Sequence, residues 1–476
     1  MKIIYKVRRS SQTIFVYSPI IIMLLFTFLI LLGSCKKFLD INPPKDRIDR
    51  SKVFENDETA TSAVIGVYSQ MAGNTLGFAS GGNSSVSVLG GLSADELKSY
   101  SDALKFFSEN QIQTNDSKIN NVWRTAYNYI YTANAIIEGL AVVNGVSEST
   151  KKQLLGEAKF IRAFCYFYLT NLFGDVPLIL NTNYKVNENA PKSSSATIYS
   201  QTITDLLDAE TLLSDSYVTN ERVRPNKWVA KSLLSRVYLY TEKWDLAAQK
   251  ASEVINHKVL YTLVNDLDKV FLKNSTEAIW QLVPPAGQNT TEGGFFILTA
   301  TPTSVSLSPD LLAAFDNSLD NRKNVWIKEL NNTTGRYSYS YKYKIRTSSL
   351  VTVPVTEYSM VIRLAELHLI RAEAKARLGQ VEPALDDINI IRRRAGIVTP
   401  VTGLNPLQCL MEIRKQRRLE LFTEWGHRWL DLKRTVEANT ILPPLKGSSW
   451  QNTDVLYPIP DEEINRNINL IQNLGY

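Results

Sequence analysis

The chain has 476 residues, of which 44% are hydrophobic, 10% aromatic and 21% charged. This is the composition of a folded globular protein with enough residues for a sizeable core, not of a disordered chain. The formal net charge is +6, but the first 34 residues hold four basic and no acidic groups, so the remainder carries only about +2. A nearly neutral chain is not expected to bind nucleic acid or an anionic lipid surface through its charge.

The N-terminus has the pattern of a bacterial lipoprotein signal. Basic residues precede an apolar run from Ile20 to Leu32, which only Thr27 interrupts and which ends in the sequence LGSC. Gly33 and Ser34 supply the small residues that a signal peptidase requires, and Cys35 supplies the thiol for lipidation. The run is shorter than the roughly 20 apolar residues of a membrane-spanning helix.

We therefore predict a signal peptide over residues 1–34 and a mature protein that begins at the acylated Cys35. The alternative is an uncleaved anchor helix, and in both cases the chain leaves the cytoplasm and stays on a membrane. Residues 35–50 include two consecutive prolines, which disfavour a helix, and are predicted to form an extended tether. The globular body is predicted over residues 51–476, and two cysteines within it are too few for a disulfide scaffold.

The body is expected to be mostly helical. From Asp57 to Met71 apolar residues recur at the spacing of one helical face, and a segment rich in glycine and serine follows over residues 73–91. Further helices are predicted over residues 118–143, 150–173, 197–213, 226–242, 244–257, 360–379, 382–395, 406–424 and 427–437.

Two segments look like copies of one unit, a helix, a tight turn and a second helix. When Ala247 is aligned with Ala384, Leu233 falls opposite Ile370 and a small residue falls opposite a small residue two positions later. This spacing is typical of tetratricopeptide repeats, with an ordinary helical hairpin as the alternative. The predicted fold class is mainly α, an α-α superhelix of tetratricopeptide-like helical pairs with an irregular, partly β insertion.

The insertion is predicted over residues 261–355, where prolines and glycines interrupt the helical pattern. Four tyrosines from Tyr337 to Tyr343 alternate with other residues there, which indicates a strand or hairpin with one ring-bearing face. Binding groups are often carried by such irregular segments on a rigid scaffold.

Common catalytic motifs are absent from the sequence. The chain has only three histidines and lacks HExxH, CxxC, GxSxG, GxGxxG and a phosphate-binding loop, so we predict no metal site, no cofactor and no catalytic residue. A two-carboxylate glycosidase stays open as an alternative, because its acid and base are defined by their separation in space. His427 has no second histidine or cysteine nearby and is interpreted as a packed side chain.

The densest polar cluster lies in residues 417–434. Glu420, Glu424, Arg428 and Asp431 would share one helical face if the helix continued past the glycine between them. We interpret the cluster as an ion-pair network where a helix docks on its neighbours, rather than as an active site.

Aromatic residues in irregular segments suggest a different chemistry. The apolar face of a sugar ring stacks on tyrosine or tryptophan, while its hydroxyl groups bind planar polar side chains. Core packing is the alternative for each large aromatic residue. Tyr100 and Trp326, each with polar neighbours, are the favoured candidates, and the full predicted ligand-binding set is Asp95, Tyr100, Trp280, Phe295, Phe296, Trp326 and Tyr337.

Six landmarks in order resemble the SusD/RagB family of outer-membrane nutrient-binding lipoproteins. They are CKKFLDINPP, EAKFIRAFCYFYLTNLFGDVPLI, NKWVAKSLLSRVYLYTEKW, RLAELHLIRAEAKARLG, RRLELFTEWGHRWLDLKR and YPIPDEEINRNINLIQNLGY, and they span nearly the whole mature chain. The sequence departs from the family pattern at Gln416, where glutamate is frequent, and at Ile468 and Leu474, where proline is frequent. All three departures lie in structural motifs.

The resemblance implies a non-catalytic lipoprotein on the outer membrane, at the cell surface, that captures an oligosaccharide and delivers it to a SusC-like TonB-dependent transporter. A peptide-capturing RagB-like protein with the same partner and a lipid-anchored glycan hydrolase are the alternatives. The family's binding residues lie in variable segments, so the candidates above come from the residues of this chain alone.

Overall fold

The structure is a computed structural model that describes residues 50–346 and 354–476; Cys35, the predicted signal peptide and nearly all of the predicted tether lie outside these residues. The chain divides into two compact units, Met1–Lys52 and Val53–Tyr476. Apart from α2 (Arg50–Val53), every described element belongs to the second unit. No helix in the described ranges is both long enough and apolar enough to cross a bilayer.

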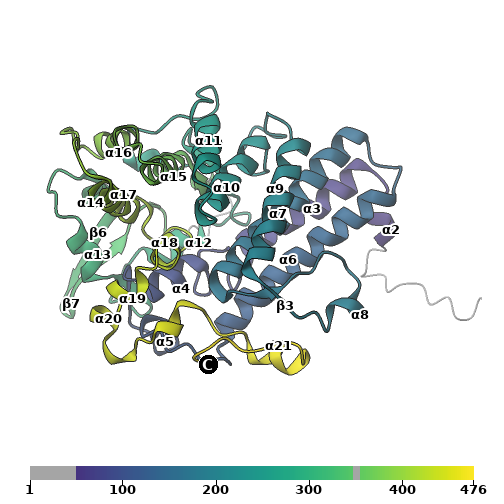
Figure 1. The fold of residues 1–476 in the computed structure, drawn as a ribbon, viewed down its shortest axis with the longest axis horizontal. Helices are drawn as coiled ribbons and strands as arrows, with labels where there is room; N and C mark the ends of the chain where they lie inside the picture. Colours follow the sequence, from purple (N-terminus) through teal and green to yellow (C-terminus); the bar gives the residue numbers. More distant parts are fainter. Residues whose placement is uncertain (1–49, 347–353) are drawn as a thin grey trace, which may run out of the picture. The chain divides into compact units, whose positions relative to one another are not determined.

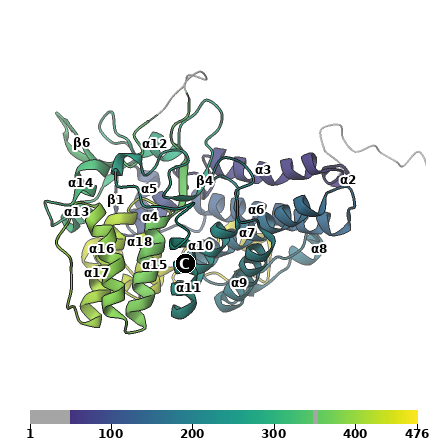
Figure 2. The ribbon, with the colours of Figure 1, turned by 90° about the horizontal axis from the view of Figure 1, so that it is seen from above.

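A group of long helices lies at one end of this second unit (Figures 1 and 2). Helix α7 is central to the group, because the other three helices all pack against it. Nearly all of its C-terminal half is buried. Asparagine, aspartate or serine side chains cap the N-termini of all four helices by accepting backbone N–H groups, as helix starts require. The helices are α3 (Asp57–Gly73), α6 (Ser117–Val142), α7 (Glu148–Phe173) and α9 (Ser195–Leu212).

The two predicted repeat copies are helical pairs. They are α10 (Lys227–Tyr240) with α11 (Trp244–Ile255), and α15 (Leu364–Arg377) with α16 (Val381–Arg394). The aligned residues are wholly buried in both copies, and the turns match as well, since Glu242 and Gly379 occupy the same repeat position and both have a left-handed backbone, with φ of 58° and 78°. Helix α11 packs on α15, so the pairs stack, and the predicted fold class is confirmed.

The insertion is partly β, as predicted. Its hairpin consists of β6 (Ile327–Asn332) and β7 (Gly335–Ser340), paired antiparallel. Tyr337 and Tyr339 on β7 are half-buried, whereas Ser338 and Ser340, which alternate with them, are buried. Tyr341 and Tyr343 lie beyond the strand. The insertion also contains the helices α12 (Thr291–Phe296), α13 (Pro309–Ala314) and α14 (Asn321–Trp326).

The structure differs from the predicted helices in two places. The glycine- and serine-rich segment, for which no helix was predicted, contains a buried helix, α4 (Val86–Ser93), and the predicted helix over 360–379 begins only at Leu364. The residues before Leu364 form β8 (Ser359–Arg363), which pairs antiparallel with β4 (Ala278–Leu282). In both cases a long-range partner outweighs the local pattern.

The remaining elements are short. The other strand pairs are β1 (Leu97–Ser99) with β5 (Val305–Leu307) and β2 (Val176–Pro177) with β3 (Lys192–Ser193). The other helices are α5 (Asp102–Ser108), α8 (Tyr184–Asn187), α17 (Pro406–Leu421), α18 (His427–Arg434), α19 (Ala438–Ile441), α20 (Pro443–Lys446) and α21 (Asp461–Arg466), with 3-10 turns at Leu267–Lys269, Gly447–Ser449 and Asn452–Val455.

The turn between α17 and α18 breaks the helix that would have placed four charged residues on one face. Three residues of the turn have a left-handed backbone, Thr423 (φ 56°), Trp425 (φ 47°) and Gly426 (φ 67°). Trp425 is fixed at both ends, because its backbone N–H donates to Ser87 Oγ at 2.9 Å and its indole N–H donates to the Met360 carbonyl at 2.8 Å. The interpretation of the charged residues as a buried ion-pair network is nevertheless confirmed.

Replacing Gly426 by alanine should destabilise the fold for two separable reasons. An added Cβ would lie 2.9 Å from the Val86 carbonyl oxygen, which is too close. The alanine would also have to adopt the left-handed backbone of Gly426, which a residue with a Cβ disfavours. Gly403 is the matched control, because it has the same φ of 67° but open space around its Cβ position. We expect Gly403→Ala to cost about 1 kcal/mol, and Gly426→Ala to cost about 1–3 kcal/mol more. Urea denaturation of both variants measures the difference, and equal losses would contradict close packing of this turn against α4.

Candidate functional site

Tyr100 and Tyr337 are the two predicted ligand-binding residues that the fold brings together. Their rings lie edge to face, with centroids 5.7 Å apart and an interplanar angle of 78°. Both side chains are half-buried, so each keeps ring surface open to solvent. We refer to this pair as the tyrosine platform.

Tyr100 is held by the strand pair that precedes it. β1 and β5 pair antiparallel, and the Tyr100 backbone N–H extends the ladder by donating to the Ser304 carbonyl at 2.8 Å. The Ser306 hydroxyl lies 3.2 Å from the Tyr100 hydroxyl. Lys98, which is exposed, places its Nζ 5.2 Å from the centroid of the Tyr100 ring, a cation–π contact.

Tyr337 is held by the β6–β7 hairpin, which packs beside β5. Its hydroxyl donates to the Thr334 carbonyl at 3.0 Å, across the tight end of the hairpin. Asn332 on β6 donates to Thr301 at 2.9 Å and so ties this end to the loop before β5. The neighbouring strand positions carry an exposed ion pair between Arg336 and Glu329 at 2.5 Å.

The platform combines ring faces with a planar polar group. Because the two rings are nearly perpendicular, they cannot both stack on one flat sugar ring, but they can contact successive units of a curved chain. The amide of Asn332 lies opposite Gly335 on the same hairpin face as Tyr337 and can bind hydroxyl groups, whereas Arg336 points to the other face because neighbours along a strand alternate. Neither Asn332 nor Lys98 was predicted from the sequence, although the alternation along β7 already indicated the hairpin.

Asp95 is a buried residue and is not part of the platform surface. Its carboxylate is buried and accepts two hydrogen bonds from Arg428, at 2.9 and 2.7 Å, and pairs with Arg418 at 3.0 Å. Burial opposes ionisation, but the hydrogen bonds and charge of Arg428 hold the pKa of Asp95 below its ordinary value. The prediction that Asp95 contacts a ligand is therefore wrong for this conformation, because the side chain is a buried ion-pair partner.

The two tryptophans proposed as ligand contacts are core residues. Trp280 is fully buried edge-on against Phe160 and Phe164, with centroids 5.0 and 5.1 Å away, and donates its indole N–H to the Val223 carbonyl. Trp326 is also fully buried and donates to the Leu267 carbonyl at 2.9 Å. Neither ring has a face open to a ligand, so core packing is the correct interpretation.

Phe295 and Phe296 belong to another part of the insertion. Phe296 is buried, whereas Phe295 is half-buried and lines a hollow of about 710 Å³ together with Arg346, Leu76 and the loop that precedes α12. The two rings pack edge to face, with their centroids 5.4 Å apart. The platform and this hollow are therefore lined by different residues.

The remaining candidate groups are His427, which lies in the protein interior, and the side chains that could bind a metal ion. His427 is buried, and burial lowers its pKa to about 4, so its imidazole is neutral at pH 7. In residues 50–346 and 354–476 no cluster of three or more histidine, cysteine or acidic side chains could hold a metal ion.

Comparisons with known proteins agree with this architecture. Residues 37–239 match the SusD-like family described as "Starch-binding associating with outer membrane", and residues 319–476 match the SusD family. SusD-like protein P25 of Formosa agariphila is 26% identical over 264 residues, which are 52% of this chain and 49% of that protein, so this match spans about half of each. SusD-like protein P2 of the same organism is 28% identical over 409 residues, or 74% of this chain and 79% of that protein.

A solved structure of a laminarin-binding SusD-like protein superimposes on 88% of this chain and 100% of its own, at 25% identity and a TM-score of 0.75. Stacked helical pairs that carry an irregular insertion define a helical-repeat scaffold protein. The two family matches together take in most of the chain, and it belongs to the SusD/RagB family.

The buried Glu96, next to Asp95 in the sequence, should make the free energy of unfolding depend on pH. Burial, reinforced by the charge of Asp95, raises the pKa of Glu96 to about 7 from its ordinary 4.5. The folded state therefore keeps this proton while the unfolded chain loses it, and stability present below pH 4.5 is lost as the pH rises to 7. Glu96→Gln should remove this loss and gain about 3 kcal/mol relative to wild type between pH 4.5 and 8.

Urea denaturation of wild type and variant at several pH values tests this, because all other titrating groups cancel in the comparison. Substitution of the exposed Glu55 by glutamine is the control and should leave the pH profile nearly unchanged. Parallel profiles for wild type and Glu96→Gln would show that Glu96 ionises normally in the folded protein.

Proposed function

We propose that this protein is a non-catalytic, lipid-anchored glycan-binding protein of the outer membrane. In this proposal Cys35 carries the acyl chains, the body lies at the cell surface, and the tyrosine platform captures an oligosaccharide. The captured glycan passes to a SusC-like TonB-dependent transporter, which supplies the energy for import. The observation that carries the proposal is the half-buried, nearly perpendicular pair of Tyr100 and Tyr337 at the edge of the insertion.

Family membership supports the glycan as ligand. One matching family is described as starch-binding, and a structural neighbour is described as laminarin-binding. Two neutral glucans are therefore named as ligands of proteins similar to this chain. The platform has the matching chemistry, since it offers ring surface and an amide without a deep charged cavity. Such open contacts give modest affinity for each sugar unit.

A binding role without hydrolysis fits the positions of the carboxylates. Glycoside hydrolysis requires two carboxyl groups on either side of the scissile bond, one of them with a raised pKa. Glu96 and Glu292 have pKa values raised to about 7 by burial, but both side chains are enclosed in the protein. Glu329, on the hairpin itself, is paired with Arg336.

Removing the ring of either platform tyrosine should weaken glycan binding. We expect Tyr100→Ala and Tyr337→Ala each to reduce affinity about tenfold, because each loses a stacking surface worth about 1.4 kcal/mol. Tyr100→Phe and Tyr337→Phe are matched controls that keep the ring and should retain most of the affinity. Titration calorimetry with the mature chain truncated after Cys35 measures the constants, after a screen of plant, microbial and host oligosaccharides and mixed peptides.

Peptide binding without a sugar signal would overturn the glycan proposal and favour a peptide-capturing role. Unchanged glycan binding in both alanine variants would place the site elsewhere. The same protein, incubated with any glycan that it binds, should release no reducing ends, and turnover abolished by loss of a single carboxylate would instead identify a hydrolase.

A further inference from the structure

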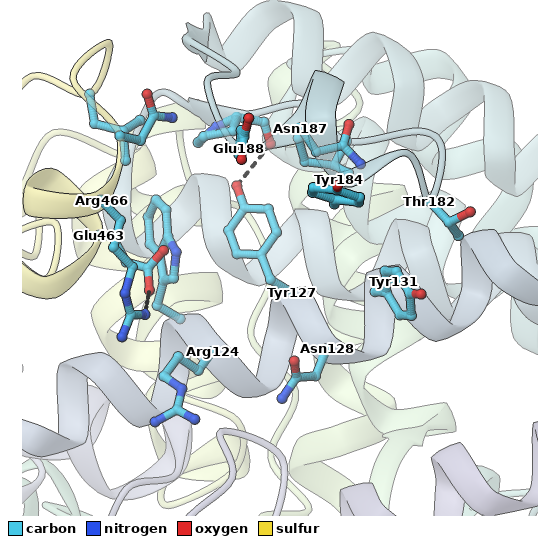
Figure 3. A pocket seen from close by; sticks show the side chains of 15 residues that line it. Arg124, Tyr127, Asn128, Tyr131, Thr182, Tyr184, Asn187, Glu188, Glu463 and Arg466 are labelled. Atoms are coloured by element: carbon cyan, nitrogen blue, oxygen red, sulfur yellow. Dashed lines mark hydrogen bonds and ion pairs between the residues drawn. The ribbon is translucent and has the colours of Figure 1, made fainter. Parts of the chain in front are cut away.

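A second aromatic hollow lies on the helical part of the unit, lined by residues other than those of the tyrosine platform. It measures about 600 Å³ and is formed by α6, by α8 with the chain around it, and by the C-terminal α21. Figure 3 shows Tyr127 at its centre, with Tyr131 and Tyr184 on one side and Glu463 and Arg466 on the other. We refer to it as the α6 hollow.

Two of the tyrosine rings that line the α6 hollow are exposed. Tyr131 is 53% exposed and Tyr184 is 67% exposed. Among the contacts of the described residues, the hydroxyls of both tyrosines and the side chains of Arg124 and Asn128 have no hydrogen-bond or ion-pair partner. Exposed ring surface beside unoccupied donors and acceptors is a pattern typical of a binding site.

The frame around these groups is rigid. Tyr127 packs against Trp123, with centroids 5.0 Å apart, and donates its hydroxyl to the Pro177 carbonyl at 2.8 Å. Thr182 anchors the chain before α8, because its backbone N–H donates to Glu138 at 2.8 Å and its hydroxyl donates to the same carboxylate. Asn467 fixes the end of α21 by donating to the Ala190 carbonyl at 2.8 Å. A ligand would therefore meet an ordered frame, which lowers the entropic cost of binding.

The charges of the α6 hollow balance. The lining contains two arginines, Arg124 and Arg466, and two glutamates, Glu188 and Glu463. Arg466 already pairs with Glu463 at 3.2 Å. This balance gives no advantage to an anionic ligand over a neutral one. Apolar ligands alone would leave Arg124 and Asn128 without partners, whereas a sugar offers both a C–H face for the rings and hydroxyls for the planar groups.

We propose that the α6 hollow is a second binding site for a neutral oligosaccharide, separate from the tyrosine platform. The choice of ligand class rests on the proposed function, but the site itself rests on the exposed rings and unpaired polar groups of α6 and α8. Tyr131 and Tyr184 supply stacking surfaces, and Arg124 and Asn128 bind hydroxyl groups between the rings and α21.

Titration calorimetry of the mature chain truncated after Cys35 tests the site. The probes are a fixed set of neutral oligosaccharides, maltoheptaose, laminarihexaose, cellohexaose, xylohexaose and mannohexaose, with an oligogalacturonate as the charged comparison. The expected wild-type result is two sites for at least one neutral probe. The double variant Tyr131→Ala/Tyr184→Ala should lose one site or weaken it about tenfold, while Tyr131→Phe/Tyr184→Phe should keep it.

The platform variant Tyr100→Ala/Tyr337→Ala separates this proposal from the preceding one. If it loses one site and keeps the site that depends on Tyr131 and Tyr184, both proposals stand. If binding disappears entirely in the platform variant and is unchanged in Tyr131→Ala/Tyr184→Ala, the α6 hollow is not a sugar site. Binding that depends only on Tyr131 and Tyr184 would support the hollow and overturn the platform.

Two further results would overturn the second site. One is the absence of binding by every neutral probe at millimolar concentration, and the other is tighter binding of the oligogalacturonate than of any neutral probe. Because both tyrosines are exposed, their replacement should leave the thermal midpoint nearly unchanged, and this measurement accompanies each titration.

Discussion

A buried cluster of balanced charges holds the insertion onto the helical scaffold. Arg363, at the end of β8 and the start of α15, pairs with Glu420 at 2.6 Å, with Glu424 at 2.8 Å and with Glu277 at 3.0 Å. Together the cluster contains four basic and four acidic side chains, all buried: Arg322, Lys342, Arg363 and Arg394 with Glu277, Asp320, Glu420 and Glu424. Removing one member would leave an unpaired buried charge, at a cost of about 3–5 kcal/mol.

The cluster explains why Trp326 is not a ligand contact. Lys342 Nζ lies 4.9 Å from the Trp326 ring centroid, and the guanidinium groups of Arg363 and Arg394 lie 5.7 and 5.6 Å from it. The ring therefore covers one side of the charges and excludes water from them. Burial lowers the pKa of Lys342 to about 8, and the charge of Glu424 opposes this shift without cancelling it. Because α14 ends in Trp326 and continues directly into β6, the same packing also positions the hairpin that carries Tyr337.

The sequence predicts the parts of this fold that depend on local pattern. The long helices and the two repeat copies follow from apolar spacing, and the left-handed turns at Glu242 and Gly379 complete the same repeat in space. Helix α4 was missed because its glycines signal a loop, whereas its burial comes from Gly90 packing against Gly426 far along the chain. Trp280 and Trp326 lie in a segment whose prolines and glycines indicate irregular structure, but distant segments supply their apolar and charged partners. Of the predicted ligand set, only the Tyr100 and Tyr337 pair was brought together at the surface.

A polysaccharide repeats one chemical unit many times, and this gives two weak sites on one protein a role that a single site cannot fill. In the proposed arrangement a short oligosaccharide would occupy either site alone, with the affinity of that site. A long chain held at the platform would present further units at high local concentration to the α6 hollow, provided that the chain can reach it. Lipid attachment through Cys35 would add many such copies on one membrane, so that one polymer could engage sites on several molecules. Retention would then rise with polymer length while each contact stays weak enough to release the glycan to a transporter.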